Sequence, residues 1–200
     1  MSAFRAFPVA GSDLRIHVSW IVILAAIVVT TADRLETADP SMAPVVRWLI
    51  GALVALGLLG SVIVHEFGHA LAGRRLGIPG GPVVVHLFGA PASPLRLATR
   101  PRDDALVAVA GPLANLVVGA IAIAVGLFLP TLSWSAAPLT AELALVVGGI
   151  GIALALVNLI PAYPLDGGRL VRAIAWRITG DPGRALHVAA LSGRASGLVC

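Results

Sequence analysis

The sequence has no lysine, a single cysteine, few aromatic residues and few charged residues of either sign. Charged side chains make up 12% of its 200 residues, against about 25% in soluble domains, whereas 58% of the residues are hydrophobic. A soluble domain of this size cannot bury so much apolar surface, and a disordered chain needs the opposite composition. The scarcity of charge therefore excludes both classes and predicts an integral membrane protein.

The basic residues and the single cysteine limit the partners and the disulfides that can be expected. All 14 basic residues are arginine, and the net charge is +4. These arginines flank apolar runs and form no basic stripe interleaved with aromatic residues, so no nucleic-acid partner is expected. Cys200 has no second cysteine to pair with, so the chain forms no internal disulfide and the redox compartment stays open. The expected surroundings are a lipid bilayer.

Four apolar runs are read as membrane-spanning helices, each of which needs about 20 mostly apolar residues. Residues 185–200 look like the start of a further helix, and residues 83–99 are rich in β-branched residues around a turn. The expected fold class is an all-α polytopic membrane protein with about five spanning helices, the last one incomplete, and a small membrane-associated β-hairpin or sheet at 83–99. The four complete spans are expected at residues 16–31, 48–73, 103–129 and 141–160.

The distribution of arginine predicts the orientation in the membrane. The connection 32–46 holds one arginine, and Arg47 follows directly after it. The connection 130–140 holds no arginine. Segments 74–102 and 165–184 hold five and four. Because cytoplasmic loops carry the excess of basic residues, these two segments and the N-terminus are expected in the cytoplasm. The protein is thus expected to be a multi-pass protein of the cell membrane.

The run His65-Glu66-Phe67-Gly68-His69 lies in the last third of the second expected span. Residues four apart share a helix face, so both histidines can bind one metal ion, and Glu66 can reach a water molecule on it. A structural role for such a run is the alternative, because matches also occur by chance. Three ionisable residues within hydrocarbon cost a few kcal/mol per charge, however, and this cost favours a catalytic zinc site.

Asp166 is the best candidate for the third protein ligand. It follows the fourth span at the same membrane depth as the two histidines, after Pro161 and Pro164 and before Gly167-Gly168, which permit a close backbone approach. The alternative role of Asp166 is a helix cap. The other acids fit less well: Glu142 lies at the opposite end of its span, and Asp103 and Asp104 occupy a first helical turn.

Three motifs in this order resemble the site-2 protease family of intramembrane zinc metalloproteases, in its bacterial and archaeal branch. They are the histidine run, the segment Gly111-Pro112-Leu-Ala-Asn115, and the segment from Asn158 to Gly168. The C-terminal CBS domains that often occur in this branch are missing, and family members continue for one or two more helices. The chain is therefore expected to be a truncated or minimal form, a single membrane-embedded metalloprotease core over residues 1–200.

The resemblance implies roles for particular residues. It implies one Zn²⁺ per chain, held by His65, His69 and Asp166, with Glu66 as the general base. It also implies that Asn158 contacts the substrate or the oxyanion. Asn115 is a further candidate for the same contact. A hydrogen bond between helices is the alternative for either asparagine. The region 83–97 is implied to present a strand edge to an extended substrate, with a re-entrant loop as the alternative.

The function implied is a zinc endopeptidase that cuts a membrane-spanning protein near the cytoplasmic side, in regulated proteolysis. Its partner would be a transmembrane substrate such as a regulator of transcription. A metal transporter or another zinc-binding membrane protein without protease activity is the alternative. Against this alternative, a glutamate adjacent to His65 is superfluous for transport.

Overall fold

The structure is a computed structural model that describes residues 3–9, 12–78, 83–85, 98–132, 137–195 and 197. It is mostly helical. The helices are α1 (Ser19–Ala38), α2 (Pro44–Arg75), α3 (Pro101–Phe128), α4 (Ala137–Asn158), α5 (Asp166–Thr179) and α6 (Pro182–Ala195). A short 3₁₀ helix, η1 (Leu129–Thr131), extends α3. The strands are β1 (Ala3–Val9), β2 (Ser12–His17) and β3 (Val83–Val85).

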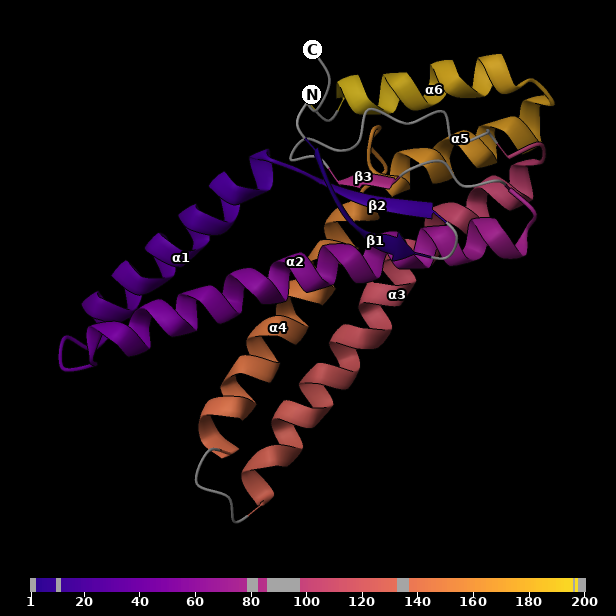
Figure 1. The fold of residues 1–200 in the computed structure, drawn as a ribbon. Coiled ribbons are helices and arrows are strands. Elements are labelled where there is room, and N and C mark those ends of the chain that lie inside the picture. The colour runs from indigo at the N-terminus through magenta and orange to yellow at the C-terminus, as the bar shows by residue number, and fades with distance from the viewer. Residues whose placement is uncertain are drawn as a thin grey trace.

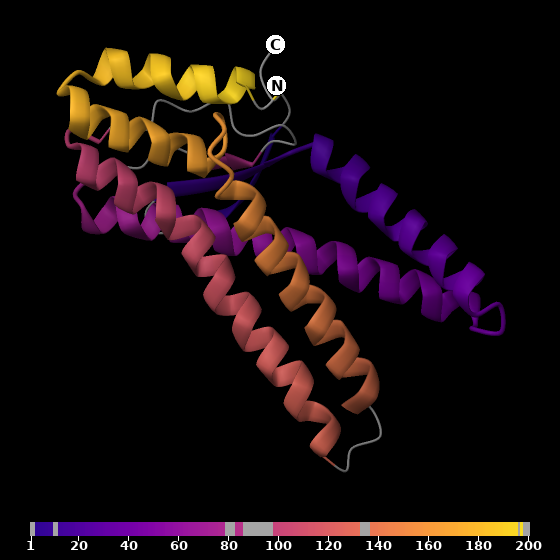
Figure 2. The ribbon, with the colours of Figure 1, turned by 180° about the vertical axis from the view of Figure 1, so that it is seen from behind.

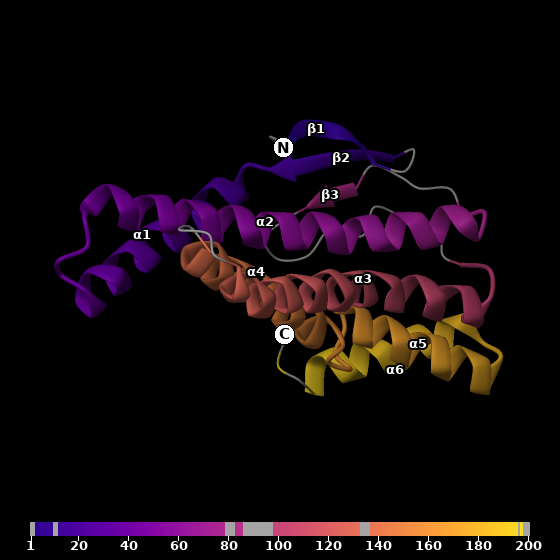
Figure 3. The ribbon, with the colours of Figure 1, turned by 90° about the horizontal axis from the view of Figure 1, so that it is seen from below.

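Two long helical hairpins diverge from one end of the molecule. The pair α1–α2 and the pair α3–α4 spread apart from the end that carries the sheet, α5 and α6 (Figures 1 and 2). At that end the elements form layers, in the order sheet, α2, α3, α5 and α6 (Figure 3). Helix α3 is the middle layer, so it contacts α2 on one side and α5 on the other.

Within the described residues, three helices are long and apolar enough to cross a membrane: α2, α3 together with η1, and α4. Only 22% to 28% of the residues in their most apolar stretches are buried inside the protein. Such a low share fits a chain whose remaining helix surface is covered by lipid. The prediction of a largely helical membrane protein is confirmed at this level.

Within the residues that the structure describes there are three candidate spans, where the sequence predicts about five. Helix α1 runs over Ser19–Ala38 and does not meet the same criterion, because Asp33, Arg34 and Glu36 lie in its last turns. The further helix expected from residue 185 is α6, which begins at Pro182 and has 14 residues. It packs along α5.

The sheet differs from the expected hairpin within residues 83–99. Strand β2 pairs antiparallel with β1 and parallel with β3, so the antiparallel pair of the described sheet is N-terminal. The parallel β3 matches the first part of the expected strand region, whereas residues 86–97 lie outside the described residues. The sequence analysis predicted no strand at the N-terminus.

Small residues bring the long helices close together. A Cβ atom at Gly119 of α3 would lie 2.8 Å from the carbonyl oxygen of Gly148 in α4, and one at Gly148 would lie 2.7 Å from that of Gly119. In the other hairpin, a Cβ at Gly51 would lie 2.7 Å from the carbonyl oxygen of Val28. Close backbone approach at small residues is the usual way in which helices associate within a membrane.

Candidate metal centre

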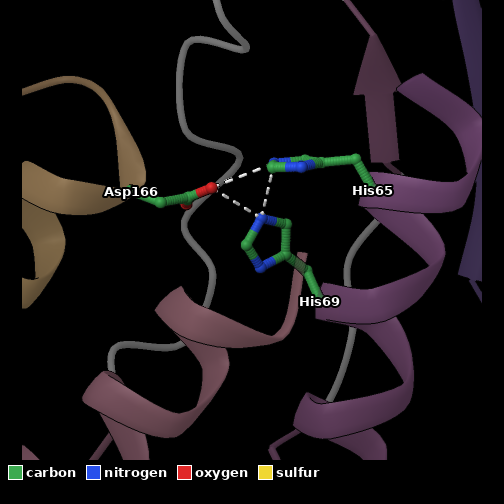
Figure 4. A group of neighbouring side chains, drawn as sticks. All are labelled: His65, His69 and Asp166. Atoms are coloured by element: carbon green, nitrogen blue, oxygen red, sulfur yellow. Dashed lines mark hydrogen bonds and ion pairs between the residues drawn. The ribbon is translucent and has the colours of Figure 1, made fainter. Parts of the chain in front are cut away.

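Helix α2 places His65 and His69 one turn apart, and both rings turn toward Asp166 (Figure 4). The two Nε2 atoms lie 3.0 Å from each other. Oδ2 of Asp166 lies 2.9 Å from Nε2 of His65 and 3.0 Å from Nε2 of His69. His65 and Asp166 are buried, and His69 is nearly so. The structure thus brings together the three side chains that the sequence analysis proposed as metal ligands.

A tight reversal of the chain after α4 carries Asp166 to this place. Asp166 is the first residue of α5, and the helix has no side-chain cap at Leu165. A Cβ atom at Gly167 would overlap the carbonyl oxygen of Ile160, and one at Gly168 would overlap the backbone of Tyr163. The two glycines therefore let α5 start directly against the end of α4. The side chain of Asp166 is directed at the histidines, whereas the alternative role considered from the sequence was a helix cap.

The hydrogen-bond partner of His69 indicates that this group fits a cation. Nδ1 of His69 lies 2.7 Å from the carbonyl oxygen of Val107, which can only accept, so Nδ1 carries the hydrogen. Nε2 of the neutral ring then presents a lone pair to the carboxylate of Asp166. Two acceptors that face each other at this distance repel unless a positive charge lies between them. A bound metal ion provides that charge.

The spacing of the ligand atoms also suits zinc. Ligands of one tetrahedral zinc ion, with bonds of about 2.0–2.2 Å, lie about 3.3 Å from each other. The three atoms here lie 2.9 to 3.0 Å apart. Within the described part of the chain, this is the one group of three or more histidine, cysteine or acidic side chains close enough to hold a metal ion.

Helix α3 fits closely around the His69 ring. A Cβ atom at Gly111 would overlap Nε2 of His69 and come within 2.7 Å of its Cδ2. At Gly68 of α2, a Cβ would lie 2.5 Å from the carbonyl oxygen of Ala110 and 2.9 Å from Cβ of Ala114. The glycine of the Gly111-Pro112-Leu-Ala-Asn115 motif therefore makes room for a ligand ring, which gives this motif a direct physical role at the site.

Buried ion pairs hold the other side of Asp166. Arg169 lies 3.7 Å from Oδ1 of Asp166 and 3.6 Å from Oδ1 of Asp104. Asp104, which is 1% exposed, accepts hydrogen bonds from two nitrogens of Arg172, the Nε bond being 3.0 Å long. Acidic and basic side chains therefore alternate along a row, in the order Asp166, Arg169, Asp104 and Arg172, with Asp104 from α3 and the others from α5.

The sequence analysis placed Asp104 in a first helical turn and missed its partner. It lies there indeed, in the first turn of α3 with Asp103. Asp104, Gly111 and Asn115 recur at steps of seven and four residues, which puts them on one helix face. That spacing was the available signal for a buried carboxylate. It could not name Arg172, because the partner is 68 residues away in the sequence.

The remaining predicted residues have different surroundings. Glu66 follows His65 and is half-buried. Nδ2 of Asn115 lies 3.5 Å from Nδ1 of His65, on the side of the ring away from Asp166. Nδ2 of Asn158 donates to the carbonyl oxygen of Leu154, 2.9 Å away within its own helix. Glu142, which the sequence analysis set aside, is exposed and outside the group.

Known proteins resemble this chain along most of its length. The model of peptidase family M50 matches residues 53–143 and 133–199. Rip3 of Mycobacterium tuberculosis carries the name of a zinc metalloprotease. It is 38% identical over 196 residues, which cover 96% of this chain and 48% of that protein. A zinc metalloprotease from Methanocaldococcus jannaschii is 28% identical over 173 residues, covering 86% and 45% of the two chains. The chain thus spans about half the length of these relatives.

Among solved structures, the site-2 protease from Methanocaldococcus jannaschii matches with a TM-score of 0.67 and 26% identity. The match covers 98% of this chain and 82% of that one. The two chains therefore share a fold along almost all of this chain.

Proposed function

Because the chain belongs to peptidase family M50, we propose that it is an intramembrane zinc endopeptidase that cleaves a membrane-spanning protein. The observation that carries this proposal is the convergence of two imidazole nitrogens and one carboxylate oxygen from α2 and α5, within 3.0 Å of one another. His65, His69 and Asp166 would hold the zinc ion. Three protein ligands leave a coordination position open for chemistry, as catalytic zinc sites do.

The proposed reaction is hydrolysis of a peptide bond. Zinc at this site would supply Lewis acidity, which lowers the pKa of water and polarises the scissile carbonyl. Glu66 takes a proton from the attacking water, whose oxygen forms a bond to the carbonyl carbon. As the C–N bond breaks, Glu66 passes that proton to the leaving nitrogen. Glu66 suits this role because it neighbours a ligand on α2 without belonging to the ligand group.

We place the active-site end toward the cytoplasm. Helices α5 and α6 lie at the end of the molecule that also carries the sheet (Figure 1). That end holds Arg169, Arg172 and Arg177, whereas the connection between α3 and α4 at the far end has no arginine. This asymmetry follows the distribution of basic residues in membrane proteins and supports cytoplasmic N-terminal and active-site ends.

Helix α1 is proposed as a fourth membrane helix. It packs along α2 over the length of the hairpin, and its 20 residues span about 30 Å, which matches the hydrocarbon core. Its charged residues are confined to the last turns, where they can reach the far interface.

Two further features support a proposal for how substrate is held. In the described part of the sheet, β3 lies at an edge, next to β2 alone. An extended substrate segment could add to such an edge through backbone hydrogen bonds. Asn158, at the end of α4, would donate its amide hydrogens to the substrate or the developing oxyanion once released from Leu154. The substrate we propose is a membrane-anchored protein, such as a regulator of transcription freed by regulated proteolysis.

An assay with purified protein tests the function. The protein in detergent is incubated with a transmembrane substrate, with and without a zinc chelator, and beside a Glu66→Gln variant. We expect cleavage by the wild type, loss with chelator, recovery after zinc is returned, and no cleavage by Glu66→Gln although it still binds zinc. Cleavage that survives complete removal of metal would refute the proposal, and turnover by zinc-loaded Glu66→Gln would refute the assignment of the base.

A further inference from the structure

Asn115 is a buried polar side chain in the middle of an apolar helix. It is 1% exposed and is among the largest fully buried side chains of the described residues. Helix α3 is otherwise so apolar that it is a candidate membrane span. Burying an amide without hydrogen bonds is costly, so a residue of this kind needs a partner. The partner that the structure shows is the His65 ring, with Nδ2 of Asn115 3.5 Å from Nδ1.

Three residues of α3 face the two histidines at steps of four. Val107 accepts the hydrogen on Nδ1 of His69, Gly111 leaves room for the ring of His69, and Asn115 meets Nδ1 of His65. Both Nδ1 atoms therefore have their partner on α3, while both Nε2 atoms lie within 3.0 Å of Oδ2 of Asp166, with Nε2 of His69 also close to Gly111. One face of α3 supports the two rings from behind in the same way.

The chemistry of imidazole decides what Asn115 must supply. A neutral histidine ring has one N–H hydrogen, so a ring that binds metal through Nε2 carries this hydrogen on Nδ1. That hydrogen needs an acceptor, and for His69 the acceptor is the Val107 carbonyl. For His65 the side chain at hand is Asn115, whose amide presents either a donor or an acceptor depending on a half-turn about its last bond.

The structure leaves room for that half-turn. A cavity of about 250 Å³ lies between α2, α3 and α4, and Asn115, Ser61 and Gly151 are among the residues that line it. The rest of its lining is glycine, alanine and valine, which offer no competing side-chain hydrogen bonds. The amide can therefore take the orientation that His65 requires.

We infer that Asn115 is a positioning residue whose amide oxygen accepts the Nδ1 hydrogen of His65 and so directs Nε2 toward the metal. This inference rests on the proposed role of His65 as a ligand. It places Asn115 next to Nδ1 of the metal ligand His65. The sequence instead predicted a contact of Asn115 with the substrate or the oxyanion. Nδ1 and Nε2 are both bonded to Cε1 but point in diverging directions, so an amide placed at Nδ1 does not occupy the direction in which Nε2 faces the metal.

The test measures zinc affinity in full-length protein with Asn115→Leu and Asn115→Asp, by competition with a chromophoric chelator. Asn115→Leu keeps the approximate volume and removes the acceptor, so we expect zinc to bind 10- to 100-fold more weakly, the loss typical of partners behind metal ligands. Asn115→Asp keeps an acceptor, so its affinity should remain close to that of the wild type. Ser61→Ala is the matched control, because Ser61 lines the same cavity and should leave affinity unchanged.

A second readout separates positioning from mere packing. The thermal unfolding temperature of Asn115→Leu without metal should not fall, because leucine is easily buried in an apolar helix. The absorption spectrum of the Co²⁺-loaded protein should change in Asn115→Leu and be restored in Asn115→Asp.

The outcomes distinguish this inference from the proposed function. Wild-type affinity in Asn115→Leu, or an equal loss in both Asn115 variants, would overturn the positioning role while the metal site stands. A wild-type protein that binds no zinc would overturn the proposed function, and the positioning role with it.

Discussion

The two ends of α3 are held by different kinds of interaction. In its first half, α3 contacts its neighbours through buried charges and hydrogen bonds, including those of Asp104 with Arg172 and of Val107 with His69. In its second half, the contact with α4 is made by glycine backbones, at Gly119 and Gly148. The first kind of contact has one correct geometry, whereas the second tolerates small shifts of one helix along the other.

This difference suggests how a membrane protein orients the side chains of a site. Lipid tails are as apolar as leucine, so apolar contacts alone do not orient a ring or a carboxylate. Helix α3 lies between α2, which carries the histidines, and α5, which carries Asp166 (Figure 3). Polar contacts from this middle helix reach both sides of the site. Three substitutions test the contrast, in order of expected effect.

The largest effect should come from Asp104→Ala, because it leaves the guanidinium of Arg172 buried without its partner. Removing one member of a buried pair costs about 3–5 kcal/mol of stability. We therefore expect a markedly lower unfolding temperature, together with weaker zinc binding, because Arg169 loses one of the two carboxylates that hold it beside Asp166. Asp103→Ala, one residue earlier in the same turn, is the control and should behave like the wild type. Equal behaviour of the two variants would show that the ion pairs do not hold this end.

Gly111→Ala should have a smaller effect on stability but a direct one on the site. The added methyl group would overlap the ring of His69, so the ring or the helix must shift. Overpacking of this kind costs about 1–3 kcal/mol, and zinc affinity should fall with it. Gly149→Ala is the control, since a Cβ there meets nothing within 4 Å. Unchanged zinc binding in Gly111→Ala would argue against a close fit of α3 around His69.

Gly119→Ala should have the smallest effect of the three and should spare the site. Its added methyl would press on the carbonyl oxygen of Gly148, and the hairpin can relieve this by a small shift. We expect a loss of about 1 kcal/mol in stability. Zinc affinity should remain at the wild-type value. A loss of zinc binding as large as that of Gly111→Ala would erase the proposed difference between the two halves of α3.

The sequence predicted those features that depend on local spacing and composition. The apolar runs gave a largely helical membrane protein, and the three motifs gave the family, both of which are confirmed. The spacing of His65 and His69 and the proline and glycine residues around Asp166 were enough to propose a group that the structure does assemble. Each of these signals is a pattern within one continuous stretch of chain.

Features that depend on distant partners were missed. The parallel pairing of β3 with β2 joins segments about 70 residues apart, and the pair of Asp104 with Arg172 spans 68 residues. The packing of α6 along α5 is likewise a contact that the spacing of residues within one segment does not reveal. Asn115 shows the same limit, since its position behind His65 follows from how α2 and α3 meet.

The central claim is that His65, His69 and Asp166 hold the catalytic zinc, and zinc content tests it most directly. Purified wild-type protein, equilibrated with zinc and freed of excess, should contain one zinc ion per chain by elemental analysis. Asp166→Ala should lose most of that metal, because an open site with two histidines holds zinc poorly. Asp103→Ala and Glu142→Ala should retain it. Full zinc content in Asp166→Ala, or a wild-type protein that binds no zinc, would contradict the account.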